Sequence, residues 1–333
     1  MSSRMSRRQW LVASAAAAGV SIAPGVKVAN AREVTLRAVS AWTEGTAFSK
    51  PFERWVQRVN ETGKGIIQIN YLGGGAKIMN IFDMGGALRR GVFDILNTTA
   101  GYYSALMPEA NAMKLAKGDM KKMRSNGAYE YYEKILNQKV NAHWLGQTKG
   151  MIPFYAFLST RSPKVDKPDF SKLKMRVSPN YRAFFTVLGA TLVQTQPSEM
   201  YTALERGVVD GYGWPNQGID ELGLLPVTKY RIEPGFFAAP NELLINLNTW
   251  NKLTPEQKKV LNDATAWVES WLDAYEVDEN AKAKKLQADN GIEVINFSPK
   301  DTEYFLKTAY DSGWKEVMQV APEHGPKLKE LFS

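Results

Sequence analysis

Residues 173–215 read LKMRVSPNYRAFFTVLGATLVQTQPSEMYTALERGVVDGYGWP, and this stretch is the most informative part of the chain. It begins with a short apolar strand that contains a single arginine, Arg176. A helix over 181–188, a second strand over 191–195 and a helix from Ser198 are expected to follow. Strands that alternate with helices at this spacing predict an α/β fold with a mainly parallel sheet.

Arg176 lies at the end of the first of these strands, among apolar neighbours. A guanidinium group offers two parallel donors and stays charged, which suits the capture of a carboxylate. A buried arginine without an anion is energetically unfavourable, so it needs an anionic partner. We therefore expect Arg176 to bind a carboxylate group, with a structural salt bridge between strands as the alternative.

The rest of the chain continues the alternation of strands and helices. Further strands are expected over 33–40, 66–72, 91–96, 140–145, 152–158 and 236–247. Helices are expected over 47–61, 78–90 and 119–138, and a long one from Thr254 to about Gln287. Because 333 residues exceed what one hydrophobic core usually supports, two lobes are expected.

The composition argues against several classes of function. The chain has no cysteine, which excludes disulfides, thiolate metal sites and thiol catalysis. Its two histidines, His143 and His324, lack the spacing of a metal site or of a nucleophile–base pair. The basic residues are spread along the chain without a nucleic-acid-binding motif. We therefore expect no catalytic residue, no metal, no cofactor and no nucleic-acid partner.

The N-terminal residues 1–31 are predicted to be a cleaved export signal. Arg7 and Arg8 precede an alanine-rich apolar run, and Ala29–Ala31 gives the small-x-small pattern of signal peptidase sites. The paired arginines are typical of a twin-arginine signal, and a Sec signal that contains two arginines is the alternative. Either route predicts export from the cytoplasm. No later stretch approaches the ~20 apolar residues of a membrane-spanning helix.

Several further motifs have a specific order and spacing. They are Leu173–Val177, Leu188–Ala190, Pro197–Gly207, Val209–Gly211 and Pro215, with Ala87–Asp94 and Glu242–Asn246 outside this block. Together they resemble the DctP-type substrate-binding proteins of TRAP transporters, and the resemblance extends over nearly all of the chain after residue 31.

The resemblance implies a periplasmic solute receptor with two α/β lobes joined by hinge strands. Lobe I is expected to contain 32–153 and 242–281, and lobe II 154–241 and 282–333. The lobes would close over a small organic acid and deliver it to separate membrane permease subunits driven by a sodium gradient. A periplasmic isomerase or lyase acting on a carboxylate, and a ligand-presenting sensor, are the alternatives to this non-enzymatic function.

In the family pattern, Arg176 matches the arginine that pairs with the substrate carboxylate. Many members that bind diacids or sialic acids have a second arginine about twenty residues earlier, near Ala156 here. Members that hold a metal have a glutamate at the position of Gly213. The resemblance therefore implies a monocarboxylate, with an apolar or aromatic body or as a 2-oxo or 2-hydroxy acid, and no bridging metal. The other expected pocket residues are Trp42, Thr98, Thr99, Tyr102, Tyr155 and Trp214.

Two tryptophans, Trp267 and Trp271, lie four residues apart on the predicted long helix. This pair is expected to pack against the body of the protein or against a second copy of the chain, which leaves a homodimer open.

Overall fold

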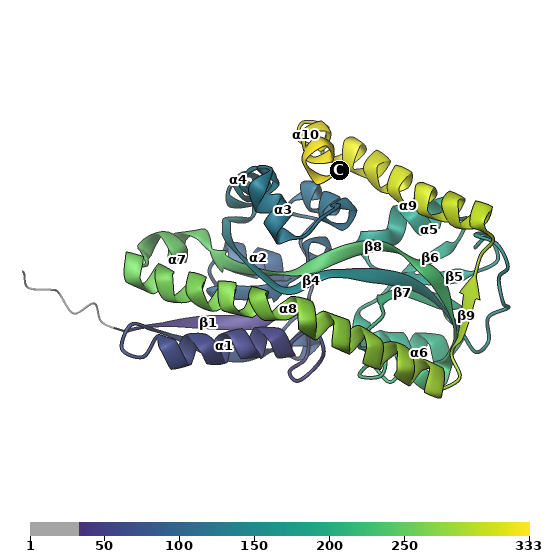
Figure 1. The fold of residues 1–333 in the computed structure, drawn as a ribbon, viewed down its shortest axis with the longest axis horizontal. Helices are drawn as coiled ribbons and strands as arrows, with labels where there is room; N and C mark the ends of the chain where they lie inside the picture. The colour runs from purple at the N-terminus through teal and green to yellow at the C-terminus, as the bar shows by residue number, and fades with distance from the viewer. Residues whose placement is uncertain (1–32) are drawn as a thin grey trace, which may run out of the picture. The chain divides into compact units, whose positions relative to one another are not determined.

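The structure is built around two long antiparallel strands, β4 (Ala142–Ser159) and β8 (Thr228–Asn246). In this computed structural model, which describes residues 33–333, they lie in one sheet with the strand order β2-β1-β3-β8-β4-β7-β5-β6. A ninth strand, β9 (Glu293–Asn296), pairs with β8. Figure 1 shows that β4 and β8 run from one group of elements to the other, as hinge strands do. The predicted export signal over 1–31 lies outside the described residues.

The first lobe is formed around β1 (Val34–Ser40), β2 (Ile67–Gly74) and β3 (Ile95–Thr98), which pair in parallel. Its helices are α1 (Lys50–Thr62), α2 (Met84–Arg89), α3 (Met120–Ser125), α4 (Ala128–Val140) and α7 (Leu247–Lys252). The long helix α8 (Pro255–Asp289) packs against α1, where the indole of Trp55 donates a hydrogen bond to Thr265 Oγ1 at 3.0 Å. This contact anchors α8 to the first lobe.

The second lobe is formed around β5 (Lys174–Val177), β6 (Thr191–Gln194) and β7 (Gly211–Pro215), with β5 parallel to both of its neighbours. Its helices are α5 (Arg182–Val187), α6 (Met200–Glu205) and α9 (Pro299–Val320). Phe184, Phe236 and Phe305 pack against one another where α5 and α9 cover β8. The C-terminal helix α10 (Gly325–Phe332) returns to the first lobe, since Asn126 Nδ2 donates to the carbonyl of Leu331 at 2.8 Å.

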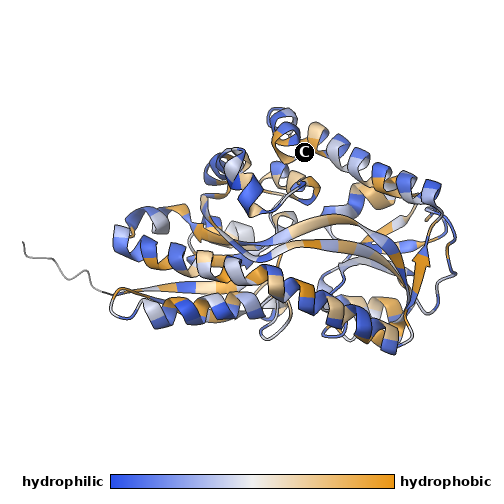
Figure 2. Cartoon of the chain, viewed as in Figure 1, coloured by the Kyte–Doolittle hydropathy of each residue, from blue (hydrophilic) through white to orange (hydrophobic). Residues whose placement is uncertain are grey.

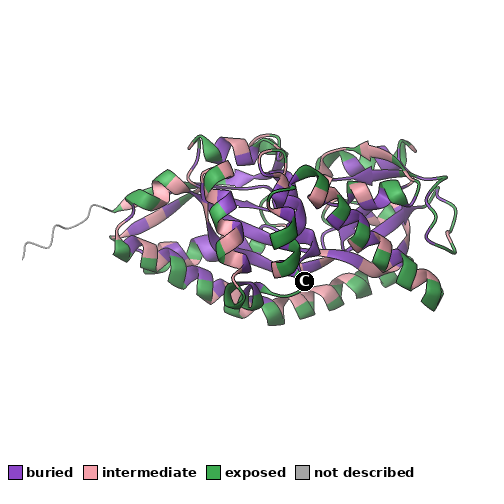
Figure 3. Cartoon of the chain, turned by 90° about the horizontal axis from the view of Figure 1, so that it is seen from above, coloured by how far each residue is buried: buried purple, intermediate pink, exposed green. Residues whose placement is uncertain are grey.

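The two-lobed α/β class predicted from the sequence is confirmed. The sheet is mixed, however, because parallel strands within each lobe are joined through the antiparallel pair of β4 and β8. Hydrophobic residues concentrate on the central strands (Figure 2), and buried residues follow the sheet while exposed residues lie on the outer faces of the helices (Figure 3). The predicted limits of the lobes stay a prediction, since residues 33–333 form a single compact unit.

Several predicted elements differ in their limits; the strand expected over 236–247, for example, begins at Thr228. The strands expected over 140–145 and 152–158 are one strand, β4, in which several register shifts absorb the intervening residues. The helix expected from 78 begins at Met84, because Asn80 Oδ1 accepts the amide of Phe82 and holds a turn there. The helix expected over 119–138 is divided at Gly127, whose φ of 83° is left-handed.

The predicted long helix is confirmed and begins with a capping box. Thr254 Oγ1 accepts the amide of Gln257 at 3.2 Å, and the Gln257 side chain accepts the amide of Thr254 at 3.0 Å. On this helix, the guanidinium of Arg54 from α1 lies 4.7 Å from the ring of Trp267 and 4.5 Å from that of Trp271. The two tryptophans therefore pack against the body of the protein. No helix within residues 33–333 is long and apolar enough to cross a membrane.

Strand β8 also carries a buried carboxyl group, that of Glu242, which is 0 % exposed. The hydroxyl of Tyr103 donates to its Oε2 at 2.6 Å, while Oε1 has no partner among the described residues. Burial raises the pKa of Glu242 to about 8, against the opposing effect of its tyrosine neighbours. The native protein therefore holds a proton here at a pH where an exposed glutamate would have lost it.

The raised pKa of Glu242 predicts how the stability of the fold depends on pH. Between about pH 5 and 8 the native state binds more protons at Glu242 than the unfolded state does, so the free energy of unfolding should fall as pH rises. The slope from this group is at most roughly 1.4 kcal/mol per pH unit. Glu242→Gln should remove it, as measured by urea unfolding from pH 5 to pH 9.

The exposed Glu303→Gln serves as the matched control and should keep the parent's slope. A difference in unfolding free energy between Glu242→Gln and the parent that stays constant over pH 5 to 8 would contradict the assignment.

Candidate functional site

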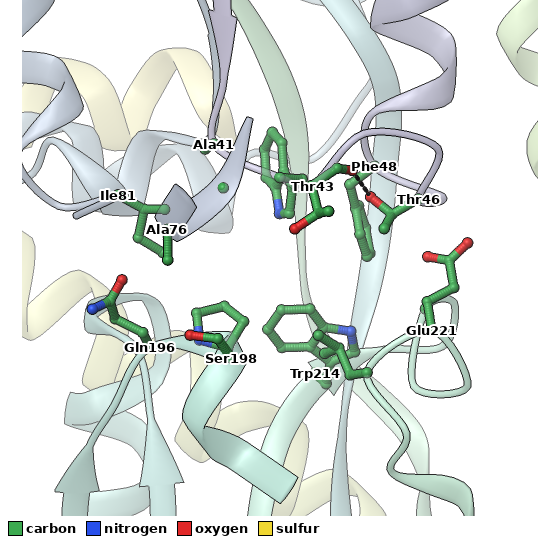
Figure 4. Close-up of a pocket in the computed structure, with 15 residues that line it drawn as sticks. Ala41, Thr43, Thr46, Phe48, Ala76, Ile81, Gln196, Ser198, Trp214 and Glu221 are labelled. Atoms are coloured by element: carbon green, nitrogen blue, oxygen red, sulfur yellow. Dashed lines mark hydrogen bonds between the residues drawn. The ribbon is translucent and has the colours of Figure 1, made fainter. Parts of the chain in front are cut away.

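A cleft lies between the two lobes, at the carboxyl ends of their parallel strands. The loop 41–48 after β1 and the segment 75–81 after β2 form one side of its outer part. Residues 196–198 after β6, Trp214 on β7 and the segment 218–222 form the other side (Figure 4). In α/β sheets, ligands bind at this edge. The outer part opens to solvent.

Adjoining this outer part is a second hollow, here called the inner hollow, whose walls are largely aromatic. The aromatic residues that line it are Trp42, Phe48, Tyr102, Phe154, Tyr181 and Trp214. The ring of Phe48 meets that of Trp214 edge-on, with centroids 5.9 Å apart, and lies 5.7 Å from the ring of Trp42. Such walls suit a small ligand with a flat or apolar body.

Arg176 lies behind the aromatic wall and is 0 % exposed. Its Nη1 donates to the hydroxyl of Tyr181 at 2.8 Å, and its Nη2 donates to the carbonyl of Thr195 at 2.6 Å. The Tyr181 hydroxyl donates in turn to the carbonyl of Gly213 at 2.5 Å. The guanidinium carbon lies 5.7 Å from the centre of the Trp214 ring. Strand β5 therefore places the guanidinium group of Arg176 next to the loop after β6 and to Trp214 of β7.

The charge of Arg176 is not neutralised within the part of the chain that the structure describes. No carboxylate of residues 33–333 lies within 4.0 Å of it, and its Nε–H has no hydrogen-bond partner there. Other buried cations differ: Lys114 lies 2.7 Å from Glu316, Lys149 lies 3.1 Å from Glu276, and Arg231 lies 3.0 Å from Glu233. The alternative of a structural salt bridge for Arg176 is thus not observed among these residues.

Four of the predicted pocket residues line the inner hollow: Trp42, Thr99, Tyr102 and Trp214. Burial raises the pKa of Tyr102 well above its usual value, an effect that the nearby charge of Arg176 opposes. Arg176 itself touches the lining through Tyr181 and Trp214.

Two predicted residues, Thr98 and Tyr155, lie outside both parts of the cleft lining. Thr98 is paired with Glu242 across β3 and β8. Successive side chains of a strand point to opposite faces, and on β4 it is Phe154 that lines the hollow. Tyr155 instead lies beneath the guanidinium of Arg231, at 5.7 Å. A role for Thr98 and Tyr155 in ligand binding stays a prediction.

The prediction missed several lining residues, namely Phe48, Phe154, Ser178, Asn180, Tyr181 and Asn241. Asn180 and Tyr181 lie four and five residues after Arg176, so their position at the end of the same strand was a usable signal. Whether Phe154 lines the cleft depends on which face of β4 turns toward it, and the sequence does not specify that face. Asn241 lies on β8 and is distant in sequence, and we find no local signal that identifies it.

Glu221 spans the outer part of the cleft. Its Oε1 and Oε2 accept the amide of Ala47 at 2.9 and 2.7 Å, and Lys50 Nζ lies 3.6 Å from Oε1. Because Lys50 is the first residue of α1, the carboxylate lies close to the N-terminus of that helix, where negative charge is favourable. Burial raises the pKa of Glu221, and the Ala47 amide and Lys50 oppose this rise. The contact joins loop 41–48 to segment 218–222.

Gly213 is required by the packing around Arg176. A Cβ atom at this position would lie 2.6 Å from Cε2 of Tyr181, which is too close for the ring to stay in place. A glutamate at 213 would therefore displace the tyrosine whose hydroxyl holds Arg176.

Comparison with solved structures shows the same fold. A TRAP periplasmic solute-binding protein from Desulfovibrio salexigens, with bound orotic acid, superposes with a TM-score of 0.80 at 18 % identity and covers 90 % of this chain and 97 % of its own. One from Sulfitobacter sp. NAS-14.1, with bound β-D-galacturonate, gives 0.77 at 21 % identity, covering 90 % and 99 %.

Among curated proteins, a monocarboxylate 2-oxoacid-binding periplasmic protein of Nostoc sp. PCC 7120 is 28 % identical over 43 % of this chain and 40 % of its own length. The C4-dicarboxylate-binding periplasmic protein DctP of Rhodobacter capsulatus is 26 % identical over 53 % and 51 %. The chain thus spans about half the length of the curated relatives it matches. The model of the DctP family matches residues 38–319. The chain therefore belongs to the bacterial extracellular solute-binding proteins, family 7.

Proposed function

We propose that the protein is the periplasmic receptor of a TRAP transporter and captures a small organic monocarboxylate through Arg176. The observation that carries this proposal is the fully buried guanidinium of Arg176, which has no carboxylate partner among residues 33–333. A ligand carboxylate would neutralise it and would accept the unpartnered Nε–H. Because the site is largely removed from water, this attraction is stronger than between exposed groups.

The walls of the inner hollow support a ligand with a single charge. None of the residues that line it carries a formal charge. Ala156 occupies the position at which diacid-binding and sialic-acid-binding relatives would have a second arginine. The other buried cation near the cleft, Lys149, is already paired with Glu276. A second carboxylate would therefore enter without a cation to meet it, which is unfavourable.

A bridging metal is not part of this proposal. The packing of Tyr181 against Gly213 leaves no room for a glutamate ligand at that position. The ligand would thus contact Arg176 directly, with its body held between Trp42 and Trp214, both of which line the hollow. Phenylacetate-like acids and 2-oxo or 2-hydroxy acids meet this description. The 2-oxoacid-binding relative from Nostoc supports this class.

In this proposal the lobes close over the acid through bending of β4 and β8, and the loaded receptor delivers it to separate permease subunits in the membrane. The contact of Glu221 with Ala47 would then help to hold the closed form, because it joins the two sides of the outer cleft. Ligand affinity should depend on this contact through the rate of ligand release.

The first prediction concerns Arg176. The acid that stabilises the parent most in a thermal-shift screen of 2-oxo acids, 2-hydroxy acids and phenylacetate should bind Arg176→Ala at least roughly a hundredfold more weakly by calorimetry. Without ligand, Arg176→Ala should be at least as stable as the parent, since an uncompensated buried charge is removed.

Arg182→Ala, an exposed arginine on α5, is the matched control and should bind normally. Undiminished binding by Arg176→Ala, or a screen in which only diacids or neutral sugars stabilise the parent, would refute the proposal.

The second prediction concerns Glu221. Glu221→Gln keeps the size of the side chain but removes the charge that faces Lys50 and the N-terminus of α1. We expect ligand dissociation to become about three- to tenfold faster with little change in association. Stopped-flow tryptophan fluorescence can report both rates, because Trp42 and Trp214 line the cleft.

The neighbouring Asp220→Asn, at an exposed position, should leave both rates unchanged. An unaltered dissociation rate in Glu221→Gln would show that this contact does not hold the closed form.

A further inference from the structure

The lining of the inner hollow includes Asn180, whose side chain makes no hydrogen bond to a described residue. This residue belongs to the 3₁₀ turn η4 (Pro179–Tyr181), four residues after Arg176. Its side chain is 4 % exposed and lines the hollow, yet it makes no hydrogen bond to any described residue. Unlike the enclosed Nε of Arg176, the amide nitrogen and oxygen of Asn180 are not fully covered by protein, so they remain accessible from the hollow. An accessible amide without a protein partner can hydrogen-bond to a ligand there.

Other buried asparagines near the cleft are paired. Nδ2 of Asn97 donates to Ser40 Oγ at 3.0 Å, and its Oδ1 accepts from Thr148 Oγ1 at 2.6 Å. Asn216 donates to the carbonyl of Asn280 at 3.1 Å. Asn180 differs from these two residues, although Oδ1 of Asn111 and Oε1 of Gln196 also lack a partner among the described residues.

The groups around Asn180 share its lack of partners. Ser178 and Thr99 line the same hollow, are 4 % and 6 % exposed, and make no side-chain hydrogen bond to the described residues. Asn241 donates from Nδ2 to the carbonyl of Phe48 at 3.2 Å, which leaves its Oδ1 available. One region of an otherwise aromatic hollow thus offers several unused donors and acceptors.

The backbone of the first lobe fixes the position of the Asn180 amide. A Cβ atom on Gly101, in the turn η2 (Ala100–Tyr102), would lie 2.0 Å from Oδ1 of Asn180. The amide therefore rests directly over the Cα of Gly101, and it can do so only because residue 101 has no side chain. This contact connects the loop after β5 with the loop after β3.

We propose that Asn180 is a specificity-determining residue that binds a second, uncharged polar group of the ligand, namely a hydroxyl, oxo or amide group. This inference rests on the proposed capture of a carboxylate by Arg176 and narrows the ligand class. The group is uncharged because the lining offers amide and hydroxyl partners and no formal charge. An acid that lacks such a group leaves the Asn180 amide unpaired and binds more weakly.

The test compares matched acids that differ by one oxygen function: phenylacetate with 2-hydroxyphenylacetate, and butanoate with 2-oxobutanoate. The parent should prefer the oxygenated acid of at least one pair by about tenfold to a hundredfold in calorimetric titration. Asn180→Leu, which has a similar shape without donors or acceptors, should lose this preference and keep its affinity for the unsubstituted acid. Asn262→Leu, the same substitution at an exposed position on α8 away from the cleft, should keep the preference.

Gly101→Ala provides an independent variant, because its methyl group would displace the Asn180 amide without altering the chemistry of that side chain. It should also reduce the preference for the oxygenated acid. A parent that binds both members of every pair equally, or an Asn180→Leu variant that weakens both members equally, would overturn the inference while leaving carboxylate capture intact. If neither member of any pair binds the parent, both the proposed function and this inference fail.

Discussion

The guanidinium of Arg176 is held out of water without a carboxylate of residues 33–333 to neutralise it, and the surrounding residues are arranged around this charge. Tyr181 and the carbonyl of Thr195 accept two of its hydrogen bonds, and Trp214 lies over its planar group. Gly213 has no side chain, which lets the ring of Tyr181 reach its place. Each of these contacts orients the arginine, but none neutralises it, and on this ground we propose that an anion completes the site.

The long antiparallel pair of β4 and β8 explains how a ligand could reach so deeply buried a charge. Because both strands run through the two lobes, bending them changes the separation of the loops at the carboxyl ends of the parallel strands. Loop 41–48 and segment 218–222 meet across the outer cleft through the carboxylate of Glu221. Opening at this contact would expose the inner hollow, and closing would remove the ligand from water.

The features that depend on local sequence patterns could be predicted from the sequence. The position of Arg176 at the end of β5 and the start of α8 at Thr254 follow from strand, turn and capping patterns. The choice between Phe154 and Tyr155 could not be made, because both faces of β4 are covered and its register shifts several times. The unpaired state of Asn180 depends on what surrounds it in three dimensions, which no local pattern encodes. The burial of Glu242 could not be predicted either, because the sequence shows this residue only as part of the Glu242–Asn246 motif.

The most direct test of the central claim is a crystal structure of the protein with the ligand that it retains through purification, or with the acid selected by screening. Our account predicts one carboxylate of that ligand within about 3 Å of the Arg176 guanidinium, including its Nε, and the ligand body between the aromatic walls. A ligand whose charged group lies elsewhere in the cleft, with Arg176 still lacking an anion, would contradict it.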